Sequence, residues 1–223
     1  MRSRPAGNFL MNDYDVLIFD CDGVILDSNA LKTNAFYQAA LPYGEEAAAT
    51  LADHHRKNGG VSRYSKFDFF LESIRPRSRK GPGRKELLES YAGWVKKGLQ
   101  SCTITSGLAE LREKTQTAKW AVVSGGDQTE LRQVFADRGI DHLFDAGIFG
   151  SPDTKDEILL REKNAGNITG RCVFLGDSAY DYNAAMNAAI DFIFVSDWTE
   201  LQNWESWCMA RNIKVISNIQ ALL

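Results

Sequence analysis

Short, continuous runs of apolar residues recur along the chain, and turn residues bound them. A continuous apolar run, unlike an alternating one, is typical of a parallel strand that is covered on both faces. Helical spacing of apolar residues at 127–139, 155–166 and 178–189 indicates helices between the runs. This strand–helix alternation predicts an α/β protein with a doubly wound parallel sheet. The expected strands are Val16–Phe19, Trp120–Val123, Ala146–Phe149, Cys172–Leu175, Phe192–Val195 and a weaker Ile213–Ile216.

One interval, from about residue 28 to residue 105, interrupts this alternation because it contains helical patterns and no convincing strand. The interval is too long to be a loop inside a compact domain. We therefore predict a Rossmann-like core made of residues 1–27 and 105–223, into which an all-helical cap domain of residues 28–104 is inserted. Its expected helices are 31–40, 45–58, 63–74 and 84–98.

Composition narrows the class of protein. The 223 residues are 44% hydrophobic and 25% charged, as in a soluble globular protein. A net charge of −3 gives no basic field for a nucleic-acid partner, and no apolar run reaches the about 18 residues that a membrane partner would imply. The 4 cysteines form no C-x-x-C pair, which favours a reduced, cytoplasmic setting.

Three further expectations concern the ends and the surface. Residues 1–12 are expected to be a loose leader, with Met11 as an alternative start. The basic stretch 75–85 is interpreted as a solvated loop rather than an anion site. A monomer or a small homo-oligomer is expected, and the sequence does not choose between them.

Polar and charged residues follow the expected strands directly. Ligands of open α/β sheets bind beyond the carboxyl ends of the strands, so these side chains should converge on one crevice. Carboxylates crowded together repel each other unless a cation lies among them, and oxygen ligands without histidine or cysteine favour Mg²⁺. The residues in question are Asp20, Asp22, Ser124, Lys155, Asp177 and Asp181.

The same residues suit phosphoryl transfer. A carboxylate can act as a nucleophile and form an aspartyl-phosphate, and a second acid two residues away can act as general acid and then base. A hydroxyl, a lysine, backbone N–H groups and a metal supply the neutralisation that the phosphoryl oxygens need. Taken singly, Ser124 could instead be a helix N-cap and Lys155 a solvated first-turn residue.

Four stretches, "DCDGVILDS", "VVSGG", "SPDTKDEIL" and "FLGDSAYD", resemble in order and spacing the motifs of the haloacid dehalogenase superfamily of phosphohydrolases. The resemblance covers residues 14–196, and the helical interval falls where that family inserts a C1-type cap. The chain is similar to the phosphoglycolate phosphatase and β-phosphoglucomutase-like members. Dehalogenases and phosphonate-cleaving members lack an acid at the place of Asp22, so its presence favours phosphomonoester chemistry.

The resemblance implies roles for individual residues. Asp20 corresponds to the nucleophile and first metal ligand, and Asp22 to the acid/base whose backbone carbonyl also meets Mg²⁺. Ser124 and Lys155 correspond to the phosphoryl-binding pair, with Gly125 also expected at the substrate. The remaining implied metal ligands are Asp177 and Asp181.

The predicted activity is Mg²⁺-dependent hydrolysis of a small phosphomonoester through an aspartyl-phosphate. The alternatives are a phosphomutase acting on a sugar phosphate and, from another class, a non-catalytic phosphoacceptor or binding module. Asp22 weighs against the latter, because an acid/base beside a phosphoaspartate hastens its loss.

Substrate choice is expected to depend on the cap. Asn29 and Lys32 stand where many related enzymes carry an acid and a histidine, which puts a simple transfer of their substrates in doubt. The stretch "KNGGVSRYSKF" resembles the cap's specificity loop, with Arg63 as a candidate substrate contact. Lys32, Arg63 and Lys66 would make the inner face of the cap cationic, which indicates an anionic or sugar leaving group. The alternative is that these three side chains are solvated surface charges. The adjacent His54 and His55 are interpreted as packed or solvated rather than as metal ligands.

Overall fold

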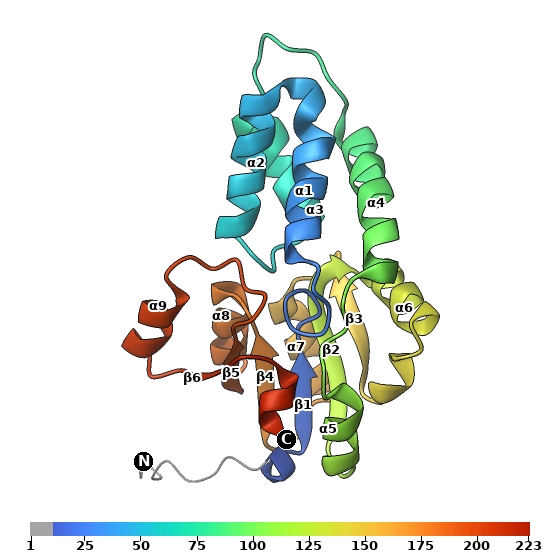
Figure 1. Ribbon diagram of the computed structural model, residues 1–223, viewed down its shortest axis with the longest axis vertical. Helices are drawn as coiled ribbons and strands as arrows, with labels where there is room; N and C mark the ends of the chain where they lie inside the picture. The colour runs from blue at the N-terminus through green and yellow to red at the C-terminus, as the bar shows by residue number, and fades with distance from the viewer. Residues whose placement is uncertain (1–10) are drawn as a thin grey trace.

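The protein is described here by a computed structural model that covers residues 11–223. A six-stranded parallel sheet, in the order β3-β2-β1-β4-β5-β6, forms its lower half (Figure 1). The predicted α/β class is confirmed, and each expected strand is present within a few residues. The strands are β1 (Val16–Phe19), β2 (Lys119–Asp127), β3 (Gly147–Ser151), β4 (Cys172–Gly176), β5 (Asp191–Val195) and β6 (Lys214–Ile216).

The sheet is doubly wound because alternate residues of each strand face two separate cores. In β1, Leu17 and Phe19 belong to one cluster, whereas Val16 and Ile18 belong to the other. Every residue of β1 is buried, which explains why the strand reads as a continuous apolar run rather than an alternating one. The helices that flank the sheet are α5 (Leu108–Lys114), α6 (Gln128–Asp137), α7 (Lys155–Asn164), α8 (Ala179–Asn187) and α9 (Trp204–Ala210).

Helices α7 and α8 begin directly after strand ends and have well-defined N-termini. Thr154 and Glu157 form a capping box on α7, and Ser178 and Asp181 form one on α8. Each box satisfies backbone N–H groups that have no partner inside the helix. The first turns of both helices are thereby fixed at the carboxyl edge of the sheet, where Lys155 and Asp181 lie.

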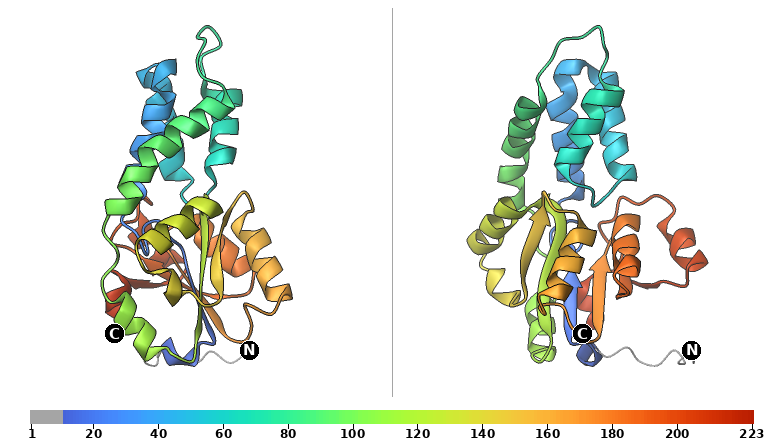
Figure 2. Two further views of the ribbon diagram at one scale, coloured as in Figure 1. Left: turned by 90° about the vertical axis from the view of Figure 1, so that its right-hand side faces the viewer. Right: turned by 180° about the vertical axis from the view of Figure 1, so that it is seen from behind.

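A layer of helices from residues 29–101, which we call the cap, lies above this edge of the sheet (Figures 1 and 2). The sheet and the helices that flank it are called the core. The four expected cap helices are present, and the third covers its expected range 63–74 as an α-helix followed by a π-helical turn. In that turn the N–H of Arg75 bonds to the Phe70 carbonyl, and the helix ends there because Pro76 favours an extended backbone at Arg75. The elements are α1 (Asn29–Ala40), α2 (Glu45–Lys57), α3 (Arg63–Phe69), η3 (Phe70–Ile74) and α4 (Arg84–Ser101).

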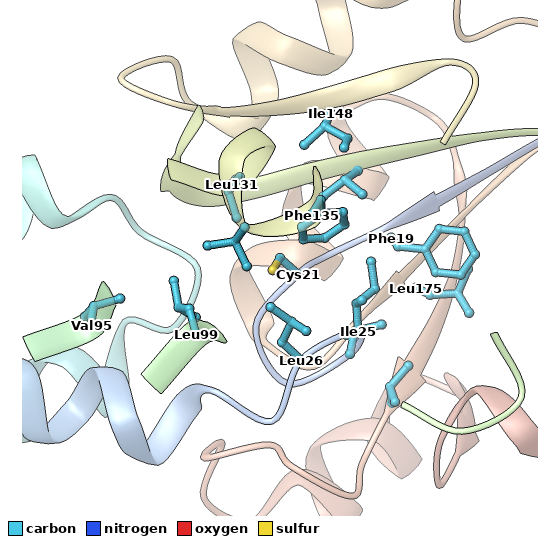
Figure 3. Packing of buried hydrophobic residues seen from close by; sticks show 14 of the residues in the cluster. Phe19, Cys21, Ile25, Leu26, Val95, Leu99, Leu131, Phe135, Ile148 and Leu175 are labelled. Atoms are coloured by element: carbon cyan, nitrogen blue, oxygen red, sulfur yellow. The ribbon is translucent and has the colours of Figure 1, made fainter. Parts of the chain in front are cut away.

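Two chain crossings connect the sheet to the helical layer, and they run antiparallel to each other. Leu26 pairs with Ile104, and the N–H of Asp27 bonds to the Thr103 carbonyl at 2.9 Å. Below them, Cys21 and Leu26 pack among apolar side chains from the sheet, α4 and α6 (Figure 3). The crossings lie close to residues 27–28 and 104–105, where the sequence suggested boundaries; the division into two domains stays a prediction.

The remaining sequence expectations have mixed outcomes. Residues 1–10 of the expected leader lie outside the described part of the chain, whereas Met11 is buried in the core, so the leader interpretation is wrong at that residue. Residues 75–83 form a loop at the tip of the cap (Figure 1). The 4 cysteines are all free. No helix within residues 11–223 is both long and apolar enough to cross a membrane.

Candidate active site

The end of β1 delivers Asp20 to the centre of the carboxyl edge, between β2 and β4. The Asp20 side chain is 2% exposed. Its Oδ1 accepts a hydrogen bond from the N–H of Cys21 at 2.7 Å and lies 3.0 Å from Nζ of Lys155. A carboxylate at this position is therefore held in a fixed orientation by the first turn of α7 and by its own loop.

Three carboxylates meet at this point. Asp20, Asp177 at the end of β4 and Asp181 in the first turn of α8 are all buried, and one oxygen from each lies within 4.8 Å of the others. Lys155 also bonds to Asp181, so one ammonium group faces two of the three acids. The sequence prediction that these strand ends converge is therefore correct.

The electrostatics of this cluster show an excess of negative charge. Burial, opposed by Lys155 and reinforced by Asp181 and Asp22, raises the pKa of Asp20 to about 7. Burial, together with the charges of Asp181 and Asp20, raises the pKa of Asp177 well above its usual value. A group of buried oxygen ligands with uncompensated negative charge, and no histidine or cysteine among them, fits a hard divalent cation such as Mg²⁺.

Glycine follows the acids of the first motif for a steric reason. Gly23 has a φ of +77°, and a Cβ placed there would lie 2.2 Å from Oδ2 of Asp177. Any larger residue would therefore push into the acidic cluster and would also adopt a strained backbone.

Asp22 lies apart from the three clustered acids. Its carboxylate accepts hydrogen bonds from the Ser28 hydroxyl and the Lys32 ammonium, both at 2.6 Å. Burial alone would raise the pKa of Asp22, but Lys32, Ser28 and Lys155 together hold it below its usual value. The sequence led us to expect four crowded carboxylates, Asp22 among them, but the structure clusters only three. The Asp22 side chain is held out of the cluster by Ser28 and Lys32.

The second motif lies within β2, which extends past the expected Val123 to Asp127 with an irregular register against β3. Ser124 is fully buried, and its hydroxyl accepts a hydrogen bond from the N–H of Gly126 at 3.1 Å. Gly125 reaches the cap, since a Cβ there would lie 2.0 Å from the carbonyl oxygen of Gly60. The core and the cap therefore approach each other backbone to backbone at this point.

A cavity of about 220 Å³ lies between the two layers. Lys155, Asp181 and Ser124 do not line it and are buried around it. Its size is below the roughly 300–1,000 Å³ of sites that hold drug-sized ligands, which indicates a small ligand. The expected site residues that do line the cavity are Asp20, Asp22, Asn29, Lys32, Arg63, Gly125 and Asp177.

The polar cap residues singled out in the sequence already contact the core. Asn29 donates from Nδ2 to Oδ2 of Asp177 at 2.7 Å and to the Trp198 carbonyl at 2.8 Å. Lys32 pairs with Asp22, as described above. Asn29 thus orients an acid of the cluster, and Lys32 is held beside Asp22.

Arg63, expected as a substrate contact, lines the cavity but is committed elsewhere. Both of its terminal nitrogens bond to the two carboxylate oxygens of Glu130 in the first turn of α6. Its guanidinium also lies 4.7 Å from the centre of the Tyr91 ring. Next to it, the Tyr64 hydroxyl donates to Asp127 at 2.7 Å. We call the Arg63–Glu130 and Tyr64–Asp127 contacts the clasp, because they join α3 of the cap to α6 of the core.

Sequence reasoning missed Glu130, Asp127 and Glu200. Thr33 on α1 donates to Glu200 at 2.7 Å, so this acid also connects the cap with a loop of the core. Glu130 and Asp127 are placed three residues apart in an ordinary helix start, and Asp127 is in fact the N-cap of α6. Nothing in that pattern distinguishes a helix-capping acid from an acid that also binds another layer of the molecule.

A covered crevice at the carboxyl edge of a parallel sheet, with a buried carboxylate cluster and a lysine against one of the acids, defines an α/β enzyme site. A family model described as haloacid dehalogenase-like hydrolase matches residues 14–189. The chain belongs to this family of hydrolases, which confirms the resemblance stated from its motifs.

Individual relatives agree with this assignment. A phosphorylated carbohydrates phosphatase of Thermotoga maritima is 24% identical over 188 residues, which are 81% of this chain and 84% of that protein. A β-phosphoglucomutase of Clostridium difficile has the same fold, with a TM-score of 0.72, 20% identity and coverage of 94% and 93% of the two chains. A haloacid dehalogenase-like family hydrolase of Streptococcus pneumoniae gives a TM-score of 0.65 at 19% identity, covering 92% and 94%.

Proposed function

We propose that the protein is a Mg²⁺-dependent phosphatase that hydrolyses a small phosphomonoester through an aspartyl-phosphate on Asp20. The observation that carries this is the meeting of Asp20, Asp177 and Asp181 within 4.8 Å, with Lys155 against Asp20 and Asp22 held apart from the cluster. The phosphatase activity in the name of the Thermotoga relative supports the same reaction class. When bound by Asp20, Asp177 and Asp181, and by the backbone carbonyl of Asp22, Mg²⁺ would neutralise phosphoryl oxygens and orient the phosphate.

In the first step, a carboxylate oxygen of Asp20 forms a bond to phosphorus while the bond to the leaving alcohol breaks. Lys155, 3.0 Å from Asp20, keeps the nucleophile charged and balances the incoming phosphoryl group. The Ser124 hydroxyl and the Gly125 backbone, in the neighbouring strand β2, serve as the other phosphoryl contacts.

The departing oxygen takes its proton from Asp22, and Asp22 draws that proton from the Lys32 ammonium, whose Nζ lies 2.6 Å from Oδ2. In the second step, water attacks the aspartyl-phosphate and gives its proton to Asp22. The proton that Asp22 accepts in this step restores the pair. The lowered pKa of Asp22 suits this second role, because its carboxylate must be free to accept a proton when water attacks.

The direct test replaces Asp20 and measures phosphate release. Asp20→Asn should abolish turnover of a panel of small phosphomonoesters and the acid-stable labelling of the protein by ³²P-substrate, while the circular dichroism spectrum stays that of the wild type. Asp27→Asn is the matched control, because Asp27 lies in the same segment but is exposed. Chelation of divalent ions should stop the wild-type reaction, and added Mg²⁺ should restore it.

Three outcomes would contradict this function in different ways. Substantial hydrolysis by Asp20→Asn would remove Asp20 from the nucleophile role. Transfer of the phosphoryl group to a sugar hydroxyl, with no inorganic phosphate released, would establish a phosphomutase instead. A phosphoprotein that persists for hours without turnover would establish a phosphoacceptor.

A further inference from the structure

The two walls of the cavity carry opposite charge. Among the described residues that line it, the core contributes carboxylates, whereas the cap contributes only cations and neutral groups. The cap cations are Lys32, Arg56, Lys57, Arg63 and Lys66.

Most of these cations are neutralised or solvated. Lys32 is paired with Asp22, and Arg63 with Glu130. Arg56, in the same wall, is paired with Asp53, and Lys57 is exposed to solvent. None of these four therefore presents an unpaired, desolvated charge to a ligand.

Lys66 differs from the others because it is 1% exposed and has no carboxylate partner among residues 11–223. Its Nζ donates to Nδ1 of His55, 2.6 Å away, and lies 5.4 Å from the centre of the Phe36 ring. An ammonium group has three N–H donors, and a buried charge without a counter-ion is costly. Lys66 lines the cavity, so its remaining donors belong to the wall that a ligand bound there would face.

His55 is suited to hold this lysine rather than to repel it. Burial, with the neighbouring charge of Lys66, lowers the pKa of His55 well below its usual value, which favours the neutral ring. A ring nitrogen that faces an ammonium group must act as the acceptor, which in this contact is Nδ1. The ring also packs against Phe36 at 4.6 Å between centres. The lysine is therefore fixed by a neutral partner that leaves its charge uncompensated.

Resting on the phosphatase function proposed above, we propose that Lys66, oriented by His55, binds an oxyanion on the leaving group of the substrate. The substrate class is then a small phosphomonoester whose alcohol part carries a carboxylate or a second phosphate. The cavity of about 220 Å³ restricts that part to a few carbon atoms beside the phosphoryl group.

The charge state of Lys66 agrees with this role. Burial, with the nearby charge of Lys32, lowers the pKa of Lys66 to about 7. A bound oxyanion would reverse this effect by favouring the charged ammonium, so binding above neutral pH should take up a proton. The titratable and charged groups that face Lys66, from α1, α2, α7 and two loops, are Lys32, His55, Lys155, Asp22 and Glu200.

The kinetic test compares matched substrates with and without the anionic group. We expect the wild type to prefer 2-phosphoglycolate over ethyl phosphate, or propane-1,3-diol bisphosphate over 3-hydroxypropyl phosphate, by tenfold or more in kcat/KM. A preference within the first pair identifies the oxyanion as a carboxylate, and a preference within the second pair identifies it as a phosphate. Lys66→Met should reduce this preference by tenfold or more, mainly through KM, and Lys66→Arg should restore part of it. Lys96→Met is the matched control, since Lys96 lies on the cap but is exposed.

A binding test separates this inference from the phosphatase function. In the Asp20→Asn background, calorimetry at pH 8 in two buffers measures the affinity for 2-phosphoglycolate and for propane-1,3-diol bisphosphate, together with the protons taken up. We expect Lys66→Met, or Lys66→Gln should the Met variant fail to fold, to weaken binding tenfold or more and to remove proton uptake. Equal losses for anionic and neutral substrates, or unchanged binding and proton uptake, would overturn the role of Lys66. If the wild type hydrolyses none of these phosphomonoesters but the binding remains dependent on Lys66, only the phosphatase function is overturned.

Discussion

The clasp between cap and core allows a quantitative prediction about how the cavity is kept closed. Replacing Glu130 by Gln or Arg63 by Met removes one partner of a pair whose side chains are 18% and 7% exposed, respectively. Each of the two terminal nitrogens of Arg63 bonds to a different carboxylate oxygen of Glu130, so the geometry is bidentate. Each single variant leaves a largely desolvated charge or acceptor without its partner, and we therefore expect both to be destabilised.

The coupling free energy of the pair follows from its burial and its number of hydrogen bonds. A charged hydrogen bond with limited solvent contact contributes about 1.5–3 kcal/mol, whereas an exposed ion pair contributes about 0–1 kcal/mol. We expect a coupling of about 1.5–3 kcal/mol for Arg63 with Glu130. The Arg84–Asp68 pair, with exposures of 49% and 46%, is the matched control and should give less than about 1 kcal/mol.

The assay is a double-mutant cycle from urea unfolding at 25 °C, using Arg63→Met, Glu130→Gln and the double variant, and the same design for Arg84→Met and Asp68→Asn. Hydrogen exchange should also become faster in α3 of the Glu130→Gln protein, because the cap opens more often. Because Arg84 also bonds to both carboxylate oxygens of Asp68, the two pairs differ mainly in burial. A coupling for Arg63–Glu130 no larger than that of the exposed pair would refute the reasoning, since burial would then add nothing.

Three further outcomes are expected. Gly125→Ala should lower kcat/KM, since a Cβ would lie 2.0 Å from the Gly60 carbonyl oxygen and the two loops would have to move apart. Gly93→Ala, which meets nothing within 4 Å, is the control, and unaltered kinetics would contradict the approach of the two loops. Asp177→Asn should raise the thermal midpoint in the presence of chelator, because it relieves the repulsion of Asp177 by Asp181 and Asp20. It should also abolish the stabilisation that Mg²⁺ gives the wild type, and differential scanning calorimetry measures both effects. Folding lowers the pKa of Lys66 from 10.5 to about 7, so between pH 7 and pH 10 the unfolded chain binds more protons than the folded chain. The free energy of unfolding of the wild type should therefore increase relative to that of Lys66→Met as the pH rises from 7 to 10. Parallel pH profiles of the two proteins in urea unfolding would exclude this.

Much of the core could be predicted because its chemistry is local in sequence. β1 is an apolar run, its residues are all buried, and the acids follow at its end. In a parallel sheet, the carboxyl ends of neighbouring strands meet at one edge, so Asp20 and Asp177 were expected to converge without knowledge of any side-chain contact.

The partners of the cap residues could not be predicted in the same way. Arg63 faces a cavity as expected, but its bond to Glu130 joins residues 67 positions apart on two separate layers. Helical spacing predicts which face of α3 is buried, and it contains no information about how α3 is placed over α6. The same holds for Lys66, which forms no ion pair with the acids that face it, as becomes visible only when the positions of all neighbouring acids are known.

The departures from the family pattern at Asn29 and Lys32 have a common electrostatic reason. The amide of Asn29 lies 2.7 Å from Asp177, so an acid at position 29 would add negative charge to a cluster in which the pKa of Asp177 is already raised. Lys32 places a permanent positive charge on Asp22, where a histidine would be charged only at lower pH. Both residues therefore reduce the excess negative charge on the core side of the cavity. With that side moderated and the other cap cations paired or solvated, Lys66 is the buried cap cation in the cavity wall that our proposal assigns to an anionic leaving group.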